Sequence, residues 1–216
     1  MKKVFQKHSL RRAFSLIELV FVIVIIAIIS TLMLQRTDSN SLQLATSQVI
    51  SHLRYTKHLA MVNNKFDAYS SDWMQTRWQL KFFQTVESDN QWAYAVYDDS
   101  YGVHSGNPNE TEIARDPLTN LLISGGYQPI SYGDERLYNK ANLGNSYNIS
   151  NISFGCGQKI GFDYMGRPLQ GDFSDDTTSY DSGILLSSRC EITISDDTES
   201  KTICIEPETG YIHQCD

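Results

Sequence analysis

Residues 11–34 read RRAFSLIELVFVIVIIAIISTLML, and this stretch decides how the chain begins to fold. Residues 14–34 form a largely apolar run of 21 residues in which Glu18 is the only charged side chain. A helix needs about 20 such residues to cross the hydrocarbon core of a bilayer. A charge within that core costs roughly 2.5–3.5 kcal/mol on insertion scales. We therefore expect a transmembrane helix in which Glu18 has a functional partner.

The charges that flank this run predict its orientation. Five basic residues and no acidic residue precede it: Lys2, Lys3, Lys7, Arg11 and Arg12. The positive-inside rule then places the N-terminus in the cytoplasm and the rest of the chain outside. A secretory signal peptide is one alternative, although residues 30–33, STLM, match a small-residue cleavage site poorly. An unprocessed signal anchor is the other alternative, and neither explains Glu18.

The residues FSLIELV at 14–20, preceded by a short basic leader, resemble the class III signal of type IV pilins and type II secretion pseudopilins. The resemblance implies that a prepilin peptidase cuts between Ala13 and Phe14 and that Phe14 is then N-methylated. Glu18 becomes the fifth mature residue, where the family carries a glutamate. The family usually has glycine before the cut. Because Ala13 is the next smallest residue, we expect processing here, at a lower rate.

The position of Glu18 agrees physically with this role. Its carboxylate lies one helical turn from the new amine of Phe14, and the helix dipole favours a negative charge in the first turn. In an assembled filament, the resemblance implies an ion pair between Glu18 and the amine of a neighbouring subunit. Such a pair stabilises two otherwise costly charges and sets the register between subunits.

Beyond this segment we expect an α+β protein, with a long N-terminal helix packed on a mainly antiparallel β-sheet domain. The predicted parts are a leader at 1–13, a transmembrane or filament-core helix at 14–37, its extension at 38–65, and a β-rich domain at 66–216 with an inserted region at about 98–147. The spacing of apolar residues predicts that the helix continues to about Val62, with His52 largely off its apolar face. The residues of that face are Leu42, Ala45, Val49, Leu53 and Ala60.

Alternating sequence predicts the strands of the domain. Residues 78–82 and 92–97 flank a polar turn and indicate a β-hairpin. Further strands are expected at 149–154, 159–164, 184–186, 192–194, 202–206 and 211–213, with a turn at 165–168. Residues 162–168, FDYMGRP, and 203–212, ICIEPETGYI, resemble the C-terminal sheet of H-type minor pseudopilins.

The four cysteines, Cys156, Cys190, Cys204 and Cys215, all follow the predicted membrane segment. An even number in an oxidising compartment predicts two disulfides, and sequence leaves three pairings open. We favour Cys190–Cys204 with Cys156–Cys215, because symmetric strand pairing about the loop at 195–201 places Cys190 opposite Cys204. A zinc site from Cys204, His213 and Cys215 is the alternative, without the CxxC spacing that would support it.

Composition and motifs point away from an enzyme. Without the leader the chain has 13 basic and 25 acidic residues. This net charge of −12 makes broad nucleic-acid binding unfavourable. The sequence has no GxSxG, no HExxH and no phosphate-binding glycine loop, so we expect no catalytic residue, cofactor or metal.

Two surface features keep alternatives open. Acidic pairs at 98–99, 175–176 and 196–197 offer oxygen ligands for calcium, but none matches an EF-hand loop, and solvated turns are favoured. Several tyrosines surround the inserted region, either as a partner-binding face or as its small hydrophobic core. These are Tyr97, Tyr101, Tyr127, Tyr132 and Tyr138.

The resemblance implies a structural minor subunit of a type II secretion or type IV pilus filament. Its expected partners are the prepilin peptidase, other pilin or pseudopilin subunits and an inner-membrane assembly platform. The expected location is the bacterial inner membrane, with a periplasmic C-terminal domain, and the filament after assembly. A tip subunit for adhesion or DNA uptake is the alternative, and an enzyme with a signal anchor is a third.

Overall fold

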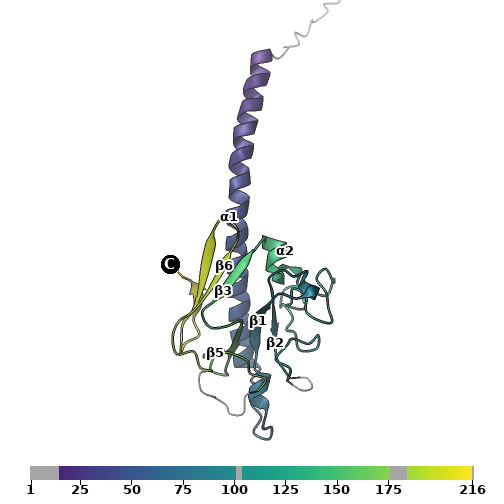
Figure 1. Cartoon of the computed structure of the whole chain (residues 1–216), viewed down its shortest axis with the longest axis vertical. Helices are drawn as coiled ribbons and strands as arrows, with labels where there is room; N and C mark the ends of the chain where they lie inside the picture. Colours follow the sequence, from purple (N-terminus) through teal and green to yellow (C-terminus); the bar gives the residue numbers. More distant parts are fainter. Residues whose placement is uncertain (1–14, 101–103, 176–183, 216) are drawn as a thin grey trace, which may run out of the picture. The chain divides into compact units, whose positions relative to one another are not determined.

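The computed structural model describes residues 15–100, 104–175 and 184–215, without the side chains of residues 31–40. The chain divides into two compact units, Met1–Ser39 and Asn40–Asp216. Figure 1 shows their helices and strands, coloured along the sequence.

Helix α1 covers Leu16–Val62 and contributes residues to both units. Its 47 residues include neither glycine nor proline, the two residues that most disfavour a helix interior. The polar residues at 38–41 therefore leave the helix unbroken. The predicted long N-terminal helix is confirmed.

Among the described residues, the strands form two antiparallel sheets of four strands each. The first sheet has the order β2-β1-β4-β5. Its strands are β1 at Gln79–Phe83, β2 at Ala93–Tyr97, β4 at Lys159–Phe162 and β5 at Pro168–Gln170. Leu80 lies opposite Val96 in β2 and opposite Ile160 in β4. The predicted hairpin between residues 78–82 and 92–97 is confirmed.

The second sheet has the order β3-β6-β7-β8. Its strands are β3 at Asn151–Phe154, β6 at Cys190–Ser195, β7 at Ser200–Ile205 and β8 at Ile212–Gln214. A short helix, η1 at Trp73–Thr76, precedes β1. Three more lie between strands: η2 at Val86–Ser88, η3 at Asn139–Ala141 and α2 at Leu143–Tyr147. The α+β class expected from the sequence is the observed one.

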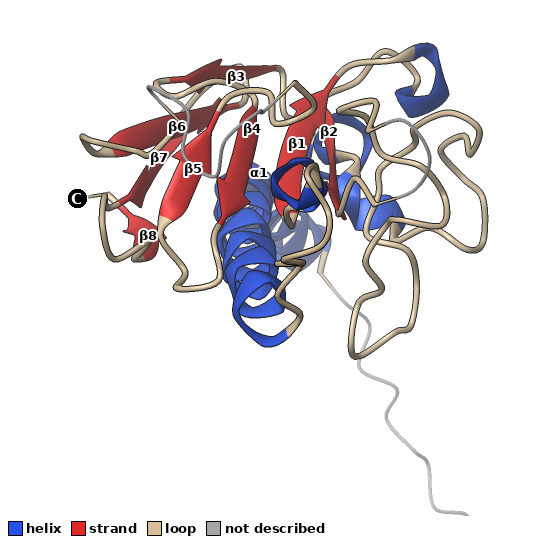
Figure 2. Cartoon of the chain, turned by 90° about the horizontal axis from the view of Figure 1, so that it is seen from below, coloured by secondary structure: helices blue, strands red, loops and turns tan. Residues whose placement is uncertain are grey.

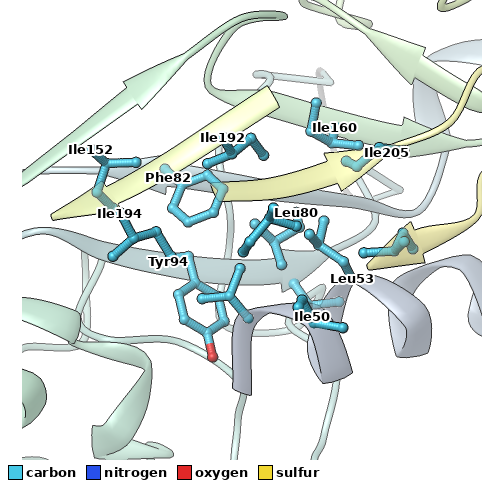
Figure 3. Packing of buried hydrophobic residues seen from close by; sticks show 14 of the residues in the cluster. Ile50, Leu53, Leu80, Phe82, Tyr94, Ile152, Ile160, Ile192, Ile194 and Ile205 are labelled. Atoms are coloured by element: carbon cyan, nitrogen blue, oxygen red, sulfur yellow. The ribbon is translucent and has the colours of Figure 1, made fainter. Parts of the chain in front are cut away.

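The second half of α1 covers one face of the strands. In Figure 2, the strands of both sheets lie on the same side of the helix. Figure 3 shows Ile50 and Leu53 of the helix close to Leu80 of β1 and Ile205 of β7. Full burial of such a side chain stabilises the fold by roughly 1.5–3 kcal/mol. The helical positions expected to face the core are all buried: Leu42, Ala45, Val49, Leu53 and Ala60.

The described part of the inserted region has a small core of its own. Isolated bridges join Ser124 to Ala95 and Ile113 to Tyr97, so the region extends the first sheet beyond β2. Tyr97 is fully buried in this core and Tyr127 packs against it. These two tyrosines therefore belong to the core, whereas Tyr101 lies outside the described residues.

Two strand predictions differ from the structure. Pro168, expected in a turn, begins β5, while residues 184–186 form a single bridge between Leu185 and Leu169 instead of a strand. Proline has no N–H to donate to a neighbouring strand, and it is tolerated as the first residue of an edge strand. At Pro168 and at residues 184–186, the sequence pattern therefore did not distinguish a turn from a strand.

Candidate functional site

Glu18 lies in the first turn of α1, and its side chain is exposed. The backbone N–H of Glu18 donates to the carbonyl oxygen of Ser15 at 3.1 Å and to the hydroxyl of Ser15 at 3.3 Å. Ser15 thus caps the helix and fixes its start. Our sequence reasoning missed this cap, although Ser15 and Glu18 have the Ser-x-x-Glu spacing of a capping box. Ala13 and Phe14 lie outside the described residues.

The helix that follows exposes apolar side chains all round. Leu16 is 81% exposed and Ile25, further along, 39%. The other exposed apolar residues of this part are Ile17, Leu19, Val20, Phe21, Val22, Ile23, Val24, Ile26, Ile28 and Ile29. A helix that is apolar on every side needs a nonpolar environment.

Among the residues that the structure describes, no helix has an apolar stretch of sufficient length to cross a membrane.

The four cysteines form two disulfides, Cys156–Cys190 and Cys204–Cys215, each with Cα atoms 5.5 Å apart. The pairing that we favoured from sequence is therefore wrong. Strands β6 and β7 pair with Cys190 opposite Ile205 and Cys204 opposite Glu191. This register differs by one residue from the symmetric one, and a one-residue shift turns a side chain to the other face of a sheet. Cys190 and Cys204 consequently point to opposite faces.

The alternative zinc site lacks two of its proposed ligands, because the sulfur atoms of Cys204 and Cys215 are bonded to each other. The third proposed ligand, His213, places Nε2 at 3.1 Å from a carboxylate oxygen of Glu206. Its ring stacks on that of Tyr211, with centroids 5.0 Å apart. His213 therefore stabilises the turn between β7 and β8.

A buried polar network joins α1 to the inserted region. Nδ1 of His52 lies 2.6 Å from the hydroxyl of Tyr94. The side-chain amide of Gln48 donates to the same hydroxyl at 2.8 Å and to the carbonyl of Lys140 at 2.8 Å, and it accepts from the hydroxyl of Tyr147 at 2.7 Å. We expected His52 off the apolar face, but it is only 6% exposed. Because buried polar groups need partners, this network fixes the inserted region to the helix.

Asp116 is the second polar partner of His52 in this network. One carboxylate oxygen lies 3.8 Å from Nε2 of His52, and the other accepts hydrogen bonds from the backbone N–H groups of Leu118 and Thr119. Although burial opposes the change, these hydrogen bonds lower the pKa of Asp116. Burial lowers the pKa of His52, and the carboxylate of Asp116 offsets this only in part. The histidine is therefore held neutral near pH 7.

The described acidic pairs bind donors of the protein itself. Asp98 forms an ion pair with Lys65. Asp196 accepts backbone hydrogen bonds from Thr198 and Glu199, both at 2.7 Å, as in a tight turn. Asp176 lies outside the described residues. In the described ranges, no group of three or more His, Cys, Asp or Glu side chains is placed to hold a metal ion.

A small pocket opens at the C-terminal end of α1. Trp73 and Trp78 line it, together with Tyr164. Cations of the same chain lie over both indoles, with Nζ of Lys65 5.2 Å from the Trp78 ring and the guanidinium of Arg77 5.7 Å from the Trp73 ring. These cation–π contacts use ring faces that a ligand would need.

A family model of the prokaryotic N-terminal methylation motif matches residues 8–34. No curated protein and no solved structure matches the chain. The matched residues include the proposed cleavage site, the Ser15 cap and Glu18. The motif is a prepilin-type signal, which indicates processing by a prepilin peptidase and assembly with other pilins. The chain thus carries the N-terminal signal of a type IV pilin-like protein.

Proposed function

We propose that this protein is a minor subunit, either a pseudopilin or a minor pilin, of a type II secretion or type IV pilus filament. One observation carries the proposal: the methylation motif at 8–34 coincides with the capped start of a helix whose first turn holds Glu18. The apolar, exposed helix surface that follows is what a filament core requires from each subunit.

Maturation begins at the cytoplasmic face of the inner membrane. The five basic residues of the leader hold the N-terminus there, and the apolar run at 14–34 crosses the bilayer once. Prepilin peptidase cuts between Ala13 and Phe14, and Phe14 is methylated on its new amine. The domain from 66 onward lies in the periplasm, where the cysteine pairs oxidise.

Assembly moves the helix from lipid into the filament. In both environments its apolar side chains avoid water, so the transfer costs little hydrophobic energy. The amine of Phe14 in one subunit and the carboxylate of Glu18 in its neighbour then form an ion pair. That pair sets the axial register of the subunits.

The H-type assignment is supported by how its two motif segments pack. Gly166 belongs to the first segment and Gly210 to the second. Both have positive φ angles, and a Cβ atom on Gly210 would lie only 2.3 Å from the carbonyl oxygen of Gly166. Lys57 of α1 donates to the carbonyl of Thr209 at 2.7 Å and so attaches this turn to the helix. The two segments therefore form one structural unit that requires glycine at both contacts.

The decisive experiment measures the intact mass and the N-terminal residue of the protein produced together with a prepilin peptidase. The expected product lacks residues 1–13 and begins with methylated Phe14. A matched sample with a catalytically inactive peptidase should retain the leader. Ala13→Gly should be processed at least as fast as the natural sequence, because it restores the residue usual before the cut.

Two results would contradict the proposal. An intact leader in the presence of active peptidase would indicate a simple signal anchor. A cut beyond Ser30 would indicate a secreted domain. If processing occurs, a deletion strain separates the two roles: loss of filaments supports the structural subunit, whereas normal filaments with lost adhesion or DNA uptake support the tip-binding alternative.

A further inference from the structure

Lys81 makes an unusual contact in the interior of the first sheet. It lies in β1, and its Nζ donates a hydrogen bond to the side-chain oxygen of Asn107 in the inserted region. A second, longer contact of 3.4 Å runs from Nζ to the carbonyl of Gly106. The ring of Tyr127 lies beside the ammonium group, at 5.3 Å. A half-buried amine thus faces a carboxamide that is 26 residues away in sequence.

The carboxamide of Asn107 is held and polarised. Its oxygen accepts from the hydroxyl of Tyr127 at 2.7 Å, in addition to the contact with Lys81. Its nitrogen donates to the carbonyl of Ser105 at 3.0 Å. Hydrogen bonds to a carbonyl oxygen stabilise the negative charge that develops there when a nucleophile attacks the carbon.

The residue after Asn107 prevents a competing reaction of its side chain. An asparagine side chain can be attacked by the backbone nitrogen that follows it, with loss of ammonia. Pro108 occupies that position, and proline has no backbone N–H. With that attack excluded, the amine of Lys81 is the nitrogen nucleophile that contacts this carboxamide.

A buried carboxyl group is hydrogen-bonded to Gly106, the residue before Asn107. Asp99 is 1% exposed, and its Oδ2 accepts from the N–H of Gly106 at 2.6 Å. Its Oδ1 is buried without a hydrogen-bond partner. Burial raises the pKa of Asp99, which makes its carboxylate a better proton acceptor than that of an exposed aspartate.

The surrounding charges favour an uncharged lysine. Burial and the neighbouring ammonium group of Lys159 lower the pKa of Lys81 to about 8, against opposing effects of Asp172 and Asp99. Lys159 forms its own ion pair with Asp172 at 2.6 Å. An amine with a lowered pKa is partly deprotonated at neutral pH, and only the neutral form is a nucleophile.

We propose that Lys81 and Asn107 become joined by an intramolecular isopeptide bond, with Asp99 carrying the proton. The lone pair of Nζ attacks Cγ of Asn107, and a C–N bond forms while charge collects on Oδ1. The bond from Cγ to Nδ2 then breaks. Asp99 takes the proton released by the amine and returns it to Nδ2, which leaves as ammonia. Amine and carboxamide thus give a secondary amide and ammonia, with no oxidant or cofactor.

The bond would act as a covalent link between β1 and the inserted region. This inference is independent of the proposed filament role, since it rests only on residues of the unit Asn40–Asp216. A subunit that bears load along a filament benefits from such a link, because a covalent bond does not open with local unfolding.

The test is the intact mass of the purified full-length protein after reduction of its disulfides. The expected mass is lower than the sequence mass by one ammonia molecule. Trypsin then locates the bond, because a modified Lys81 is not cleaved: a single cross-linked peptide of residues 78–115 should replace the separate peptides 78–81 and 82–115. The full sequence mass together with both separate peptides would overturn the proposal.

Four variants assign the roles. Lys81→Arg keeps the charge and should abolish the mass loss, and Asn107→Asp should convert the loss of ammonia into a loss of water. Asp99→Asn should slow bond formation at least tenfold in a time course after synthesis. Lys140→Arg, at an exposed position, is the matched control and should keep the full mass loss. Mass loss that persists in Lys81→Arg, or that disappears in Lys140→Arg with the fold intact by circular dichroism, would refute the assignment.

Discussion

At the scale of the residue, His52 illustrates how tertiary contacts set the state of one side chain. It occupies α1 between the hydroxyl of Tyr94 and the carboxylate of Asp116. The ring of Tyr138 also packs against it edge-on, with centroids 5.3 Å apart. Burial lowers the pKa of His52 below its ordinary value of 6.5. The folded state therefore takes up fewer protons at this site than the unfolded state near pH 6.

This difference predicts a loss of stability on mild acidification. A group whose pKa is depressed by folding contributes stability above its unfolded pKa, and this contribution falls as pH drops toward the folded pKa. The fragment 40–216, which contains every described core cluster, should lose free energy of unfolding between about pH 7.5 and about pH 5. Urea unfolding at a series of pH values measures it.

Two variants separate His52 from other titrating groups. His52→Gln should flatten the slope over that range, whereas His58→Gln, at an exposed position of the same helix, should leave it unchanged. Asp116 does not contribute to the slope over that pH range. Its pKa is lowered from 3.8, so its contribution to the free energy of unfolding is lost only at lower pH. An unchanged slope in His52→Gln would refute the account.

At the scale of the element, the β6–β7 hairpin decides the disulfide framework. Its register turns Cys190 toward the core, where it is 1% exposed, and Cys204 toward the opposite face. The first disulfide spans 34 residues of sequence and the second spans 11. In the chain-entropy view, a longer closed loop restricts the unfolded chain more.

Removing each disulfide should therefore have unequal effects. Replacing Cys156 and Cys190 by serine should cost roughly 4 kcal/mol of unfolding free energy, against roughly 3 kcal/mol for Cys204 and Cys215. Urea unfolding of the two double variants of fragment 40–216 gives the comparison. A larger loss for the Cys204 and Cys215 pair would contradict the entropic argument.

At the scale of the whole molecule, the two units have opposite relations to water. The unit Asn40–Asp216 buries its apolar side chains in core clusters, and the chain after the leader carries a net charge of −12. The described side chains at 16–29 are all exposed and, apart from Glu18, apolar. Large exposed apolar surfaces mark association sites, so the first unit requires lipid or other subunits.

Assembly is therefore where Glu18 should matter. Glu18→Ala should enter the membrane normally, since it removes a charge from the apolar segment, but its incorporation into filaments should fall. Loss of one partner of a buried ion pair costs roughly 3–5 kcal/mol, enough to reduce incorporation more than about tenfold. Quantifying the variant in sheared filaments and in membranes measures both effects.

A conservative variant provides the control. Glu18→Asp keeps the carboxylate on a shorter side chain and should retain more incorporation than Glu18→Ala. Equal incorporation of Glu18→Ala and the natural protein would rule out the ion pair.

Local patterns in the sequence were sufficient for several features. The apolar run at 14–34 and the spacing of Leu42, Val49 and Leu53 predicted α1 and its buried face. Period-two alternation predicted the β1–β2 hairpin. These features depend on interactions between near neighbours along the chain, so their signals are local. The methylation motif is local for the same reason.

Tertiary structure alone decided the remainder. The pairing of Cys156 with Cys190 depends on a one-residue register that symmetric pairing did not capture. The burial of His52, and the contact of Lys81 with Asn107, depend on where the inserted region docks. No local pattern encodes such long-range juxtapositions, because they arise when the core closes and brings distant segments together. The sequence by itself determined that the chain has a pilin-like N-terminal signal and a long helix. Packing determined which side chains from distant segments come into contact.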